Sequence, residues 1–87
     1  MDFFIQRQQL AQSLVDFLNI EMDLAMTFAA LARTRAKSGH AKEAEKSKQN
    51  AITALASVRR YFDRLPEHEK PAIEKRRDEV QLIVSAL

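Results

Sequence analysis

The sequence has 87 residues, of which 46% are hydrophobic, and a formal net charge of +2; it contains one glycine, two prolines and no cysteine. A chain this apolar and this close to neutrality does not belong to the disordered class. Without cysteine it also lacks the disulfides that staple many small folds. A domain of this size buries only about 60% of the surface that its unfolded chain exposes, so we expect marginal stability and help from a partner.

No stretch of the chain approaches the roughly 20 consecutive apolar residues that cross a bilayer. Glutamines and an arginine interrupt the apolar residues of the first dozen positions, unlike the core of a secretory signal peptide. The absence of cysteine fits a reducing compartment. We therefore expect a soluble, cytoplasmic protein without membrane contact.

The only helix breakers divide the chain into three segments. Gly39 supplies the left-handed residue that commonly closes a helix, Pro66 disfavours helical geometry at the residue before it, and Pro71 is tolerated only in a first helical turn. The other abundant residue types are neutral or favourable in helices. We expect a single all-α domain over 1–87, a three-helix antiparallel bundle with a long first helix. The expected helices are about 2–38, 41–65 and 70–87.

The first expected helix is apolar over an unusually wide arc. Its apolar residues recur at spacings of three, four and seven and cover roughly 220° of the circumference, against the ~100° of an ordinary surface helix. We expect the two later helices, whose stripes are narrower, to cover it from two sides. The main stripe comprises Leu10, Leu14, Phe17, Leu24, Phe28 and Leu31.

Short turns make successive helices antiparallel neighbours, which fixes their register. The turn positions place Leu65 opposite residue 14 and Leu87 opposite residue 49, so the third helix covers only part of the hairpin. Residues 1–13 then overhang without a partner for roughly 20 Å at 1.5 Å per residue.

This overhang is apolar, and soluble monomers rarely leave such a cluster in water. We therefore predict a homo-oligomer, with a dimer favoured, that associates through Phe3, Phe4, Ile5 and Leu10. A terminus that frays or folds back is the alternative.

Small and apolar residues around the first turn stand at the spacings of a helical repeat. They are Phe28, Leu31, Ala32, Gly39, Ala44 and Ala51. In this pattern the hairpin resembles a single degenerate tetratricopeptide repeat over about 34 residues. It departs from the family where Arg35 and Lys48 replace large aromatic residues. Because no second copy follows, the resemblance implies protein–protein interaction but no solenoid groove.

The sequence offers no catalytic, cofactor-binding or metal-binding pattern, so we expect no enzyme. It has no cysteine nucleophile, too few glycines for a phosphate loop and no Glu-x-x-His pair for a di-iron site. His40 and Glu43 stand at the N-cap and third positions of the second expected helix, as the two members of a capping box do. Glu21 falls within the apolar arc, and an ion pair would compensate its burial. The expected partner is Arg59 or Arg60, with Arg76 or Arg77 of the third helix as the alternative.

The segment 33–48 is basic, with six cationic residues against Glu43 and Glu45. These are Arg33, Arg35, Lys37, Lys42, Lys46 and Lys48. They suggest a second function, the binding of nucleic acid or another anionic partner at the hairpin tip. Nucleic acid is disfavoured because no aromatic residues are interleaved with the basic ones. Cations at a helix end and a solvated charged face explain much of the pattern. We therefore predict a non-catalytic helical interaction or self-association module.

Overall fold

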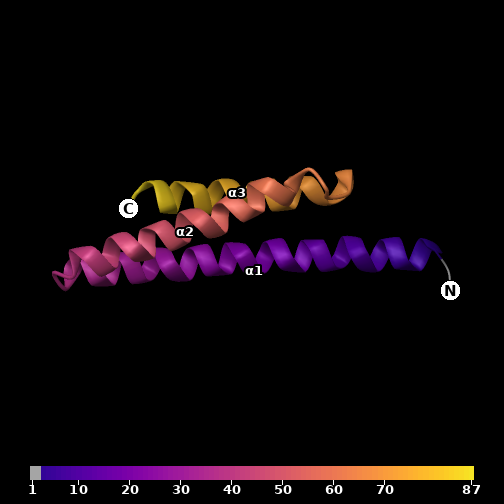
Figure 1. The fold of residues 1–87 in the computed structure, drawn as a ribbon. Coiled ribbons are helices and arrows are strands. Elements are labelled where there is room, and N and C mark those ends of the chain that lie inside the picture. Colours follow the sequence, from indigo (N-terminus) through magenta and orange to yellow (C-terminus); the bar gives the residue numbers. More distant parts are fainter. Residues whose placement is uncertain (1–2) are drawn as a thin grey trace.

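The computed structural model describes the backbone of residues 3–87 and the side chains of Gln6 and residues 9–87. Within this part of the chain all regular structure is helical: α1 (Phe3–Lys37), α2 (Ala41–Phe62), a 3-10 turn η1 (Glu67–Glu69) and α3 (Lys70–Ser85). Figure 1 shows α2 folding back along α1, and α3 folding back along α2. The predicted all-α, three-helix antiparallel arrangement with a long first helix is confirmed.

The turn between α1 and α2 is built on the only glycine. Gly39 has φ +80°, in the left-handed region, and its N–H donates to the carbonyl of Ala36 at 3.2 Å. The N–H of His40 donates to the carbonyl of Arg35 at 2.8 Å. This pair of bonds is the Schellman motif, which satisfies carbonyls at a helix C-terminus. The expected side-chain cap is wrong: His40 occupies the N-cap position of α2, but its side chain makes no capping hydrogen bond.

The second turn begins earlier than the sequence predicted. α2 ends at Phe62 rather than at residue 65, and Leu65 donates its N–H to the carbonyl of Phe62 at 3.0 Å within a turn. The residues between Phe62 and Pro66 form a tighter turn with i to i+3 hydrogen bonds, also from Arg64 to Tyr61, and Pro66 disfavours helical geometry at Leu65. η1 follows, and Pro71 lies within the first turn of α3, where its missing N–H costs nothing.

The core lies where all three helices meet. α1 contributes Leu18 and Met22, both fully buried, and α2 contributes Leu55 and Val58. The buried residues of α3 are Ile73, Val80 and Val84. Within residues 3–87, no helix combines the length and apolarity that crossing a bilayer requires.

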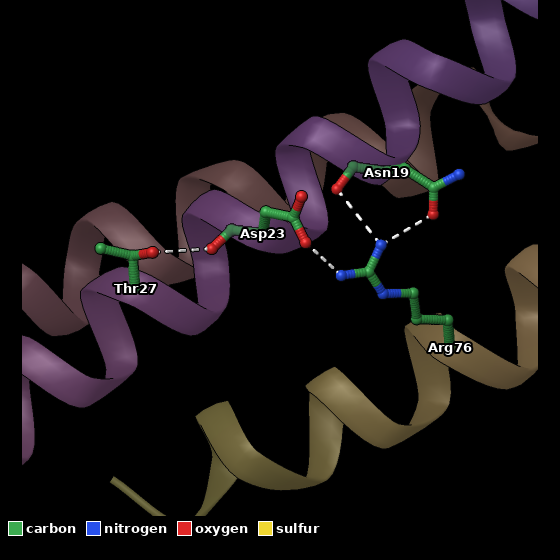
Figure 2. Close-up of polar contacts among 4 residues, drawn as sticks. All are labelled: Asn19, Asp23, Thr27 and Arg76. Atoms are coloured by element: carbon green, nitrogen blue, oxygen red, sulfur yellow. Dashed lines mark hydrogen bonds and ion pairs between the residues drawn. The ribbon is translucent and has the colours of Figure 1, made fainter.

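A polar contact ties α3 to α1 at the edge of this core. Figure 2 shows the guanidinium of Arg76 reaching across to α1, where it donates to the side chain of Asn19 at 2.7 Å and pairs with the carboxylate of Asp23. The hydroxyl of Thr27 donates to the backbone carbonyl of Asp23 at 3.0 Å. A third-helix arginine therefore pairs with the first helix, at Asp23.

The ends of the three helices do not coincide at either end of the molecule. Leu65 lines the same surface hollow as Leu14, as the register predicts. At one end α1 runs on past the α2–α3 turn, and at the other the hairpin tip runs on past the C-terminal end of α3 (Figure 1). The core therefore has three helices in the middle of the molecule, but only two at the hairpin tip.

Candidate functional site

A line of apolar side chains on α1 stays exposed to solvent. Leu10 is 71% exposed, Phe17 39%, Leu24 41% and Leu31 37%. The four residues are seven positions apart, and at 100° per residue such positions drift by only about 20° per step, so they form one continuous stripe. Ile20, 57% exposed, lies beside it. We call these five residues the α1 stripe.

The α1 stripe corrects the expectation that α2 and α3 cover the whole apolar arc of the first helix. Those helices bury a different side of α1, along Leu18, Met22, Ala25, Ala29 and Ala32. α2 and α3 pack together on this one side, so their cover does not extend around the whole arc of roughly 220°. One apolar side of α1 is therefore left without an intramolecular partner.

One edge of the α1 stripe is formed by an aromatic pair. The rings of Phe17 and Tyr61 meet edge to face with centroids 5.7 Å apart. The guanidinium of Arg64 lies 4.8 Å from the centre of the Tyr61 ring, and that of Arg60 lies 5.7 Å from it. The side of α2 next to the stripe thus carries two cations held against an aromatic ring.

The backbone of the predicted association segment is helical from Phe3. The side chains of Phe3, Phe4 and Ile5 lie outside the described residues. Leu10, the fourth, is largely exposed, as predicted. The sequence analysis missed the contribution of Phe17, Leu24 and Leu31, which it assigned to the core. Helical spacing could not have separated them, because the buried residues Leu18, Ala25 and Ala32 recur at the same seven-residue interval.

The structure does not bring Glu21 together with Arg59 or Arg60. Glu21 is half-buried, and among the described residues it has no ion pair. Arg59 instead donates to Gln81 of α3, and Arg60 lies against the Tyr61 ring. The ion pair fails because these arginines have partners on or beside α2 itself, while partial exposure leaves the Glu21 carboxylate in contact with water.

The six basic residues of the hairpin tip fall into three groups. Arg35 is half-buried and donates to the hydroxyl of Ser47, which is fully buried between the helices. Lys42 and Lys46 are exposed. Arg33, Lys37 and Lys48 line a groove of about 490 Å³ next to the end of α3. The structure thus gathers half of the predicted anionic-partner residues in one place.

One lysine, at the start of α3, has a shifted pKa. The hydrogen bond with Glu67 raises the pKa of Lys70; desolvation opposes this, and the negative charges of Glu67 and Asp63 add smaller raising effects. Within the described residues, no three His, Cys, Asp or Glu side chains gather in a metal-binding cluster. The two features with a distinct chemical character are therefore the α1 stripe and the groove at the hairpin tip.

Comparison with known proteins adds no further constraint. No family model matches the chain, and no curated protein and no solved structure is significantly similar to it. The resemblance of the first hairpin to a tetratricopeptide repeat stays a prediction.

Proposed function

We propose that this chain is a non-catalytic helical interaction module that forms a homodimer through α1. The observation that supports the proposal is the exposed α1 stripe, in which leucine and phenylalanine recur every seven residues. A seven-residue apolar repeat is the pattern by which one helix packs along another in a coiled coil. The partner that this surface suits is therefore a second helix with a matching stripe.

The spacing of the α1 stripe favours a second copy in antiparallel orientation. Leu10, Phe17, Leu24 and Leu31 are symmetric about the point between residues 20 and 21. A two-fold axis there places Leu10 of one copy opposite Leu31 of the other, and Phe17 opposite Leu24. Such self-complementarity is what an interface between two identical surfaces requires.

Charge and burial support the same arrangement. Residues 1–26 carry four acidic residues against one arginine, whereas 33–48 is basic. An antiparallel pair brings the acidic part of each first helix toward the basic end of the other, although salt screens this attraction beyond ~8 Å. Covering the exposed fractions of the stripe contributes roughly 4 to 7 kcal/mol per protomer, enough to matter to a marginal domain.

The test is the mass in solution of the wild-type chain, of a double variant of the α1 stripe and of a control variant outside it. We expect the wild-type chain at micromolar concentration to have twice the monomer mass by size exclusion with light scattering. Leu10→Gln combined with Leu24→Gln removes two members of the stripe and should give a monomer. Leu82→Gln changes a leucine of α3 that is 74% exposed but lies off the stripe, and it should leave the dimer intact.

Circular dichroism at the same concentration separates loss of association from loss of folding. A wild-type chain that is monomeric, or a Leu82→Gln variant that dissociates as readily as the stripe variant, would contradict the proposed dimer.

A further inference from the structure

The groove at the hairpin tip is the strongest feature outside the α1 stripe. It lies between α1 and α2 and is lined by four alanines, Ala32 and Ala36 of α1 and Ala41 and Ala44 of α2. Ala86 and Leu87, just past the end of α3, complete its lining. It is therefore a shallow apolar channel between two helices, adjoining the end of the third.

The position of the groove indicates the shape of its occupant. α3 packs against both α1 and α2, and the hairpin runs on past the end of α3 (Figure 1). The groove is lined in part by Ala86 and Leu87, just past the end of α3. The groove therefore continues the surface between α1 and α2 on which α3 packs. From Ala41 to Lys48, α2 rises about 12 Å, so the free stretch accommodates roughly two turns of a helix.

The rim of the groove indicates the charge of its occupant. Arg33 and Lys37 stand four residues apart on α1, and Lys48 faces them from α2. Glu45 is the only acidic residue of the lining, and its carboxylate accepts a hydrogen bond from Gln49 at 3.0 Å. Among the side chains that the structure describes, none forms an ion pair with the three cations.

The lining suits a protein helix better than a nucleic acid. The floor consists of methyl groups, which contact a small apolar helix face closely but offer nothing to phosphates. No aromatic side chain lines the groove, so bases would find no surface to stack on. Carboxylates four residues apart on a helix would meet Arg33 and Lys37 at their own spacing.

We propose that the hairpin-tip groove binds an acidic amphipathic helix of another protein in line with α3. The small apolar residues of that helix lie on Ala36 and Ala44, and its Asp or Glu side chains pair with Arg33, Lys37 and Lys48. The groove and the α1 stripe share no residue, because the groove lies on the α3 side of the hairpin whereas the α1 stripe is not covered by α3.

A designed peptide tests the proposal by fluorescence anisotropy. The probe is a labelled, end-capped alanine-rich helix of about three turns, with glutamates four residues apart along one edge. We expect saturable binding to the wild-type chain. Arg33→Glu with Lys37→Glu should weaken it at least about tenfold, since like charges are then brought together. A lysine version of the peptide should bind this variant more tightly than it binds the wild type.

The matched control is Lys42→Glu with Lys46→Glu, which changes the net charge by the same amount outside the groove. We expect this control to weaken binding by less than about threefold, because exposed charges at a distance interact weakly. Ala36→Leu fills the groove without changing any charge, and it should weaken binding about tenfold through steric exclusion. Circular dichroism verifies that each variant keeps its helical content.

Three outcomes overturn the proposal. The first is an absence of saturable binding to the wild type. The second is an equal loss in the two charge-reversed variants or no loss in Ala36→Leu, since either shows general attraction to a basic surface. The third is a duplex oligonucleotide that competes for the same residues and binds more tightly than the peptide, which would assign the groove to nucleic acid.

Discussion

The middle of the molecule and the hairpin tip use the same two helices but close them differently. In the middle, where α3 lies across the hairpin, the fully buried residues include the large side chains of Leu18, Met22 and Val58. Toward the tip, α1 and α2 meet through small residues, with Ala29, Ala32 and Ser47 buried between them. At the end that α3 does not cover, small residues let the backbones of α1 and α2 approach closely.

The two regions also differ in what they leave for other molecules. On the α3 side, the middle is filled by the chain itself, whereas the tip has a groove with a cationic rim. We infer that stability is concentrated in the middle, since a region with few large buried contacts contributes little to the free energy of unfolding.

The largest expected effect is a cavity in the middle. Leu18→Ala should lower the free energy of unfolding by about 2 to 5 kcal/mol, because Leu18 is fully buried and its neighbours cannot fill the space. Urea unfolding followed by circular dichroism, at one fixed protein concentration, measures the change. Leu82→Ala makes the same substitution at a site that is 74% exposed and should cost less than about 0.5 kcal/mol. Equal costs at the two sites would refute the assignment of the core.

A smaller effect is expected at the turn that forms the tip. Gly39→Ala should cost about 1 to 2 kcal/mol, because a side chain is strained at φ +80°. No atom lies within 4 Å of the position that the new Cβ would occupy, so the cost is one of backbone conformation and not of collision. Gly39→Asn should cost less, since asparagine tolerates left-handed geometry better than alanine does. An asparagine variant less stable than the alanine variant would contradict this explanation.

The smallest expected effect is at the polar contact of the two-helix end. Ser47→Ala should cost about 0.5 to 1.5 kcal/mol, the usual contribution of one hydrogen bond, because it removes the acceptor of the Arg35 guanidinium. Arg35 is only half-buried, so water can replace the lost partner. A double-mutant cycle with Arg35→Ala isolates the contact. A loss as large as that of Leu18→Ala would show that the two regions do not differ in the way described.

Local sequence signals determined the elements of this fold. One glycine, two prolines and a composition favourable to helices were enough to place three helices and both turns, because these signals act on the backbone of a few adjacent residues. Antiparallel pairing and register followed from the short turns, so the contact of Leu65 with the Leu14 region could be predicted. The end of α2 was placed three residues late, since Pro66 restricts only Leu65, whereas the turn before it already has i to i+3 hydrogen bonds and is no longer α-helical.

Only the tertiary structure decided which apolar side of α1 is buried. The sequence showed that Leu18 and Leu24 both belong to a wide apolar arc, but not that Leu18 would be fully enclosed and Leu24 would remain 41% exposed. The same holds for the partner of Arg76, which reaches Asp23 and not Glu21. Helical periodicity fixes the angle of each side chain about its own axis, whereas the side on which the next helix lies depends on how all three pack together.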